Sequence, residues 1–72
     1  MISYEKAKNL LERTIFLEPS NLLAWRLKGI AHNKLNEETL ANLSAAEEFL
    51  IRQDFNRSKY FANKVLKTSK LK

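Results

Sequence analysis

The sequence contains no cysteine, and only one glycine and one proline, in 72 residues. Without cysteine it has no disulfide framework, no thiolate nucleophile and no cysteine-based metal site. The scarcity of glycine and proline argues against an all-β fold, because such a fold needs many tight turns. A chain of this length makes one small domain, and its balance of apolar and charged residues is that of a folded chain.

Long apolar runs are also absent. The longest is four residues, 22–25, whereas a membrane span needs about 20. The N-terminal segment contains Glu5 and lacks the apolar stretch of a signal peptide. We therefore expect a soluble, cytoplasmic protein.

The net charge of +5 is unevenly distributed. Residues 1–54 carry seven basic and eight acidic side chains, whereas residues 55–72 carry six basic side chains and no acidic one. The positive charge therefore belongs to the last quarter of the chain and needs an explanation separate from the fold.

Apolar residues recur at three- and four-residue spacing along most of the chain, which is typical of amphipathic helices. The expected helices span about residues 3–17, 22–35, 37–52 and 55–68. Their short connections make consecutive helices antiparallel neighbours and leave no room for a sheet. We therefore expect an all-α fold of four antiparallel helices in a single domain, residues 1–72.

The expected helix ends follow from local chemistry. Ser3, Ser20–Asn21 and Asp54 offer N-caps. Pro19 ends the first helix, because the residue before a proline is pushed out of the α region. Asn36 separates the second and third helices, since asparagine tolerates the left-handed conformation.

The second helix is apolar on most sides, so we expect it to be central, with neighbours on more than one face. Gly29 in its interior lowers helix stability by about 1 kcal/mol relative to alanine. A glycine here would be explained if the backbone of another helix came close to it. Small residues in the third helix, Ala41, Ala45 and Ala46, would allow tight helix contact. Aromatic residues at helical spacing are expected in the core; they are Tyr4, Trp25, Phe49, Phe55 and Phe61.

The last helix is strongly amphipathic. Its apolar side comprises Phe55, Ser58, Phe61, Ala62, Val65 and Leu66. Its basic face comprises Arg57, Lys59, Tyr60, Lys64, Lys67 and Lys70. This basic face has three interpretations: a solvated face that complements the helix dipole, a site for an acidic protein, or a site for nucleic acid or an anionic membrane.

Phe16 projects among polar residues of the first helix. It is either covered by the third helix or part of a docking surface.

Three stretches of the chain resemble the tetratricopeptide repeat. One resembles a second repeat helix and its proline turn, and it carries Tyr4, Ala7, Leu11, Thr14, Ile15, Leu17 and residues 18–21. The next is similar to the start of a following repeat, with Trp25 and Gly29 at the family's spacing. The last is similar to the end of a first helix, an acid–aromatic turn and a second helix, and it carries Ala46, Phe49, Asp54, Phe55, Ser58, Phe61, Val65 and Leu66.

The chain also departs from the repeat pattern. Lys28 stands where the family has leucine, and His32 where it has tyrosine. Two stretches read as first helices, one at Leu22 and one at Thr39, only 17 residues apart. The resemblance therefore implies a short right-handed array of about two repeats that starts on a second helix. Stacked repeats usually need about three units, so a second copy or a partner would be a natural cover for the exposed end.

The resemblance further implies a ligand groove lined by first helices. The matching positions are Leu23, Arg26, Ile30, Asn33 and Lys34 in the second helix, and Leu43, Glu47 and Leu50 in the third. Of these, Arg26, Asn33 and Lys34 could engage a carboxylate or an acidic peptide. The alternative is that these positions only pack or are solvated.

Neither catalytic nor metal-binding spacing is present. His32, the only histidine, has no nucleophile or further ligands spaced to act with it. The adjacent pairs Glu37–Glu38 and Glu47–Glu48 point about a hundred degrees apart on a helix, so they form no carboxylate dyad. We therefore expect no enzyme activity, no cofactor, no metal and no small-molecule substrate.

The leading hypothesis is a protein–protein interaction module, an adaptor or small chaperone-type subunit that binds a partner protein or peptide or associates with itself. One alternative is a basic protein that binds nucleic acid or an anionic membrane through its last helix. Another is a structural fragment or designed repeat with no ligand of its own.

Overall fold

The computed structural model describes residues 3–69. It is all-helical in this range, with four helices in chain order. They are α1 (Tyr4–Leu17), α2 (Leu22–Lys34), α3 (Glu38–Ile51) and α4 (Phe55–Ser69). The expected all-α fold is confirmed, and each helix begins and ends within one residue of its expected position.

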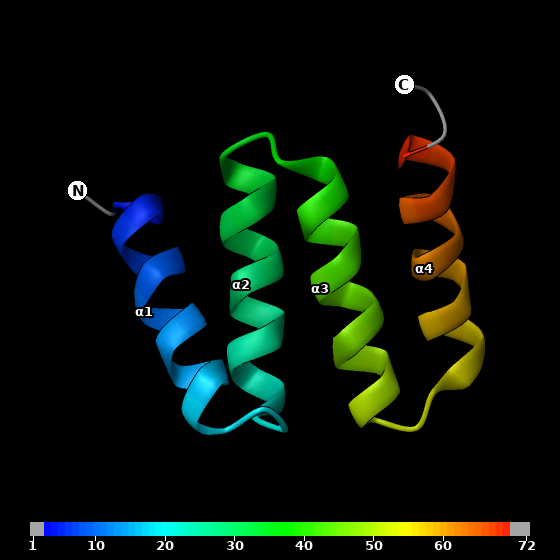
Figure 1. The fold of residues 1–72 in the computed structure, drawn as a ribbon, viewed down its shortest axis with the longest axis horizontal. Coiled ribbons are helices and arrows are strands. Elements are labelled where there is room, and N and C mark those ends of the chain that lie inside the picture. The colour runs from blue at the N-terminus through cyan, green and yellow to red at the C-terminus, as the bar shows by residue number, and fades with distance from the viewer. Residues whose placement is uncertain (1–2, 70–72) are drawn as a thin grey trace.

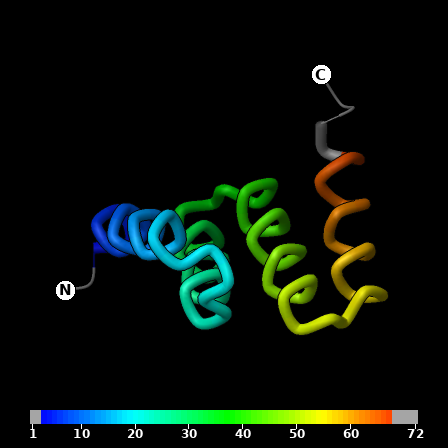
Figure 2. The backbone as a smooth tube through the Cα atoms, turned by 60° about the horizontal axis from the view of Figure 1, so that its bottom comes forward, coloured from blue at the N-terminus to red at the C-terminus, as the bar shows by residue number. Residues whose placement is uncertain are grey.

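The helices lie side by side in chain order, and consecutive helices run in opposite directions (Figure 1). Contacts join α1 to α2, α2 to α3 and α3 to α4, and no other pair of helices touches among the described residues. The expected central place of α2, between two neighbours, is therefore confirmed. Figure 2 shows the same order from a second direction, with α1 and α4 at opposite ends of the row.

Side-chain caps set three of the helix starts. Ser3 Oγ accepts from the Lys6 amide at 3.3 Å, and Asn21 Oδ1 accepts from the Ala24 amide at 3.0 Å. Asp54 Oδ1 accepts from the Arg57 amide at 3.2 Å. These bonds satisfy amides that have no partner inside the helix.

Left-handed residues separate the later helices. Asn36 has a φ of 60° and lies between α2 and α3, as expected. Gln53 has a φ of 63° and lies between α3 and α4. The second position could not be predicted from the sequence, because glutamine is not a residue that favours this region.

The core consists of small side chains. Its fully buried apolar residues are Ala24, Ala31, Ala41 and Ala46. Tyr4, Trp25, Phe49 and Phe61 are half-buried. Small residues between helices allow close approach, but they leave the larger side chains near the surface.

The prediction that Phe55 lies in the core is wrong, since it is 62% exposed. The reason is the rotation of α4 about its axis. Ser58 Oγ donates to the Ala46 carbonyl at 2.9 Å, and Phe61 stacks on Phe49 with ring centroids 5.6 Å apart. This seam turns Phe55 and Leu66 to the outer edge, where no described helix covers them.

The array is thin. Its extents are 32 × 29 × 18 Å, and a single helix with side chains is about 10–12 Å across. No second layer covers the faces of the row within the described residues. Among those residues, no helix combines the length and apolarity needed to cross a membrane.

Candidate functional site

One face of α2 is open along its whole length. The side chains on it are exposed to solvent and include every α2 residue that the sequence assigned to a groove: Leu23, Arg26, Ile30, Asn33 and Lys34. This face combines leucine and isoleucine with cationic and amide groups and contains no acidic residue. It is open because α1 and α3 both pack against the opposite side of α2.

An apolar groove runs between α1 and α2 beside this face. It has a volume of about 320 Å³, and its lining residues are Tyr4, Ala7, Leu10, Leu11, Leu27, Ile30 and Ala31. The Tyr4 hydroxyl is the only polar side-chain group in this lining. Leu10 is 65% exposed and Leu27 is 41% exposed, so the groove is open to solvent.

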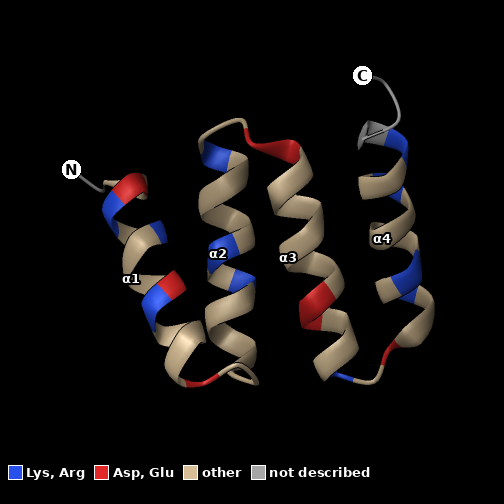
Figure 3. Cartoon of the chain, in the orientation of Figure 1, with Lys and Arg blue, Asp and Glu red and all other residues tan. Residues whose placement is uncertain are grey.

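Two lysines flank one end of the groove. Lys6 lies one turn before Leu10 on α1, and Lys34 lies one turn after Ile30 on α2. Because the two helices are antiparallel, both lysines belong to the end of the pair where the chain enters α1 and leaves α2. Figure 3 shows basic positions at this end of both helices, with acidic positions on α1 and on the connection from α2 to α3. Both are exposed, and neither makes an ion pair with a described residue.

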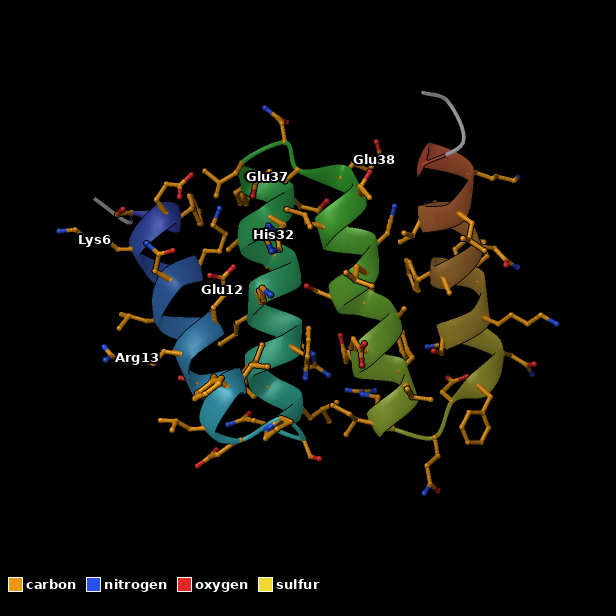
Figure 4. The ribbon with its side chains drawn as sticks, in the orientation of Figure 1. Lys6, Glu12, Arg13, His32, Glu37 and Glu38 are labelled. Carbon is orange, nitrogen blue, oxygen red and sulfur yellow. The ribbon has the colours of Figure 1, made fainter. Side chains whose placement is uncertain are left out.

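The nearby acidic side chains of α1 form ion pairs with other lysines. Glu5 pairs with Lys8 at 3.4 Å, and Glu12 pairs with Lys28 at 3.9 Å. In Figure 4, Glu12 points toward α2, whereas Lys6 and Arg13 point away from the array. Lys6 and Lys34 therefore have no acidic side chain of α1 paired with them.

The structure does not bring the predicted α3 positions together with those on α2. Leu43, Glu47 and Leu50 lie on the side of α3 opposite to the residues that face the open side of α2. The α3 residues that line the hollow next to α2 are instead Ala41, Asn42, Ala45, Glu48 and Phe49. Leu43, Glu47 and Leu50 do not line this hollow, and their role in binding stays a prediction.

Phe16 is 83% exposed, so the third helix does not cover it. It lies on the face of α1 that also carries Glu12, away from the apolar groove. Its role in docking stays a prediction.

The basic face of α4 divides into two sides. Arg57, Tyr60, Lys64 and Lys67 follow one side, and Lys59 lies near the outer edge with Phe55 and Leu66. Lys64 Nζ lies 5.3 Å from the Tyr60 ring centroid, and Arg57 pairs with Asp54 at 3.5 Å. Lys70 lies outside the described residues.

A buried ion-pair cluster joins three elements at the α2–α3 junction. His32 is 2% exposed, and its Nδ1 lies 2.7 Å from Glu37 Oε1. Lys8 Nζ reaches the same carboxylate at 3.4 Å from α1. Figure 4 shows His32 and Glu37 close together at this junction.

The two charged members of this cluster, Glu37 and Lys8, have shifted pKa values. The hydrogen bond with His32, assisted by Lys8, lowers the pKa of Glu37 even though desolvation opposes the shift. Desolvation lowers the pKa of Lys8, but hydrogen bonds and charge from Glu37 and Glu5 outweigh it and raise the pKa above its ordinary value. The cluster fastens α1 to the α2–α3 turn.

A second ion-pair cluster joins α2 to α3. Glu48 is 8% exposed; it accepts a hydrogen bond from Arg26 Nε at 3.2 Å and forms an ion pair with Arg52 at 3.4 Å. Arg26, which the sequence placed in a ligand groove, is thus engaged within the array.

A polar cleft of about 560 Å³ lies beside α3 and α4. Its lining residues are Asn33, Asn36, Glu38, Asn42, Phe61 and Lys64. Asn42 is 8% exposed, and its Nδ2 has no hydrogen-bond partner in the part of the chain that the structure describes. Three amides, one acid and one base give this cleft mixed polarity.

Sequence reasoning missed most of the apolar groove. It assigned Tyr4 to the core and did not single out Leu10 or Leu27. The available signal was the stripe Leu23, Leu27, Ile30, Lys34, at spacings of four, three and four residues, which marks one helix face.

No known family model, curated protein or solved structure matches this chain.

Proposed function

We propose that this protein is a protein–protein interaction module, a short tetratricopeptide-like helical array that works by binding another protein chain. One observation carries the proposal: within residues 3–69 the buried apolar residues are all alanines, whereas many large apolar side chains are exposed. Among the residues whose burial the structure describes, twelve large apolar or aromatic side chains are exposed, from Leu27 at 41% to Phe16 at 83%. Surfaces of this kind typically mark interaction sites in folded proteins.

The arrangement of helices supports this interpretation. A single row of helices buries one seam between each pair and leaves both broad faces open. In stacked helical arrays such open faces are the surfaces that bind partners. The absence of a catalytic spacing in the sequence is consistent with binding rather than chemistry.

The test is site-specific photo-cross-linking. A photoreactive side chain is placed singly at Leu27, Leu43 and Leu66, on three different exposed surfaces, and at the exposed Asn56 as a matched polar control. We expect discrete cross-linked products from at least one apolar position in an extract of the source cells, and none from Asn56. Sedimentation of the purified chain identifies products that are copies of itself. A monomer that yields no product from any of the three positions contradicts the proposal.

A second candidate function is binding of nucleic acid or an anionic membrane surface through α4. It is favoured by Arg57, Tyr60, Lys64 and Lys67, which share one side of a helix that contains no acid. Binding of this kind weakens steeply with salt. Substituting Lys67 with glutamine should weaken binding of RNA or anionic vesicles more than the same change at Lys59, which lies on another side. Equal, salt-independent binding by both variants contradicts this candidate.

A further inference from the structure

We infer that the groove between α1 and α2 binds an amphipathic helix of a partner protein, one that carries aliphatic side chains on one face and acidic residues toward one end. The inference rests on the proposed function and names the site and the chemistry of the partner. It follows from the composition of the groove, from its length and from the charge at its end.

The composition of the groove favours a helix over an extended peptide. The lining offers one hydroxyl, that of Tyr4, and otherwise only apolar side chains. An extended peptide laid on this wall would turn main-chain amides and carbonyls toward groups that cannot hydrogen-bond to them, which is costly. A helix satisfies its own main chain and presents only side chains.

The dimensions agree with this occupant. The groove lining runs from Tyr4 to Leu11 on α1 and from Leu27 to Ala31 on α2, which is about 10 Å of α1 at a rise of 1.5 Å per residue. About two turns of a partner helix would lie along this stretch. Its apolar side chains at three- and four-residue spacing would contact Leu10, Leu27 and Ile30, which is the helix-in-groove mode of recognition.

The charge at the groove end indicates the sign of the partner's charge and the direction in which the partner helix lies. Lys6 and Lys34 lie at the same end and have no ion-pair partner among the described residues, while Glu5 is held by Lys8. Acidic residues of the partner would therefore lie at the end marked by Tyr4 and Lys34. A second copy of the chain fits less well, because the two end helices of the row both carry cations that make no ion pair within residues 3–69. These are Lys6 and Arg13 on α1, and Lys59 and Lys67 on α4.

The test uses labelled synthetic peptides and fluorescence anisotropy with the full chain. The probe is a capped 16-residue peptide with leucines at helical spacing on one face and glutamates on its flanks. One control peptide has the same composition in alternating order, so that it favours a strand, and another replaces every glutamate with lysine. We expect the probe to bind and both controls to bind at least about tenfold more weakly.

Two variants and one matched control locate the site. Leu27→Asp should weaken probe binding by about tenfold or more, and Lys34→Glu should weaken it by several-fold and reduce its salt dependence. Leu43→Asp changes a leucine of nearly equal exposure on the far side of α3, 44% against 41%, and should leave binding unchanged. Leu27→Ala is a milder change at the same position and should also weaken probe binding. Circular dichroism of each variant checks that it is still folded.

Several results overturn the inference: no binding of the probe, equal binding of the alternating peptide, or equal loss from Leu43→Asp and Leu27→Asp. These results are distinguishable from failure of the proposed function. If cross-links form from Leu43 or Leu66 but not from Leu27, the proposed function as an interaction module stands, and the groove between α1 and α2 is excluded as its binding site. The absence of all cross-links, with a probe that binds no variant, removes both.

Discussion

Gly29 lies in the middle of α2, on the side that faces α3. A Cβ built there would lie 3.6 Å from Ser44 Cβ and 3.7 Å from the Ala41 carbonyl oxygen. Both distances are ordinary van der Waals contacts, and Gly29 does not have a positive φ. The α3 backbone does come close, but its approach leaves room for a methyl group. Close packing therefore does not require glycine at this position.

Gly29→Ala should accordingly stabilise the fold. The expected gain in the free energy of unfolding is about 0.5–1 kcal/mol, because alanine restricts the unfolded chain and favours the helix. Urea denaturation followed by circular dichroism measures it. Ala31→Gly in the same helix, at a buried position, is the opposite control and should destabilise. A loss of stability in Gly29→Ala would mean that α2 and α3 pack more tightly than these distances indicate.

At the scale of elements, α3 differs from its neighbours because its start has no side-chain cap. Its N-cap residue, Glu37, makes no capping hydrogen bond and instead binds His32 and Lys8. The carboxylate thus ties α1, α2 and the start of α3 together. This contact links residues 29 positions apart in the chain.

The lowered pKa of Glu37 predicts a loss of stability in acid. A carboxyl group with a lower pKa in the folded state stabilises the fold above its unfolded pKa, about 4.3, and loses that contribution as the pH falls through the folded value. Lys8 has the opposite dependence: its raised pKa gives a contribution that is lost only as the pH rises through that value.

Glu37→Gln should therefore melt at a lower temperature than the unmodified chain at neutral pH, and the difference should shrink as the pH falls below about 4. Thermal melts between pH 3 and 7 measure it. Glu47→Gln, a change to an α3 acid with no ion pair among the described residues, is the matched control and should show no such convergence. A constant difference across this range would contradict the role assigned to Glu37.

At the scale of the whole molecule, the fold is a linear array. The inner helices, α2 and α3, each have two neighbours, whereas α1 and α4 each have one. In such arrays stability comes from each helical unit and its nearest-neighbour interfaces. The end helices are consequently stabilised by fewer interfaces than the inner helices.

Hydrogen exchange should reflect this arrangement. Backbone amides of α2 and α3 should exchange most slowly, and those of α1 and α4 faster, because opening an end helix breaks one interface and opening a middle helix breaks two. Exchange measured by mass spectrometry or NMR tests the order. Binding of the helical probe in the groove should slow exchange in α1 more than in α4. Uniform protection along the chain would contradict a nearest-neighbour array.

Much of this fold could be predicted from the sequence because helix formation is local. Periodicity, the caps at Ser3, Asn21 and Asp54, and the breaks at Pro19 and Asn36 all act within a few residues. They determined the number of helices and their ends. The break at Gln53 escaped prediction because nothing in its local chemistry favours a left-handed residue.

The candidate site was less predictable, because it depends on how each helix is rotated against its neighbours. An amphipathic pattern shows which residues share a face of a helix, but not which face a neighbour covers. Leu23, Ile30 and Lys34 were recognised on the open face of α2, whereas Leu10 and Leu27 were not singled out and Phe55 was misplaced. Leu43 and Leu50 share a face of α3, but that face points away from α2.

The sequence by itself thus determined an all-helical chain of four segments, with its excess positive charge in the last, since both follow from short-range patterns and composition. Only the tertiary structure decided which alanines are buried and which large apolar side chains are exposed. It also decided which charges meet across the chain, as Lys8 and Glu37 do. These outcomes depend on contacts between distant residues, where one bond such as that from Ser58 to the Ala46 carbonyl can set the rotation of a whole helix.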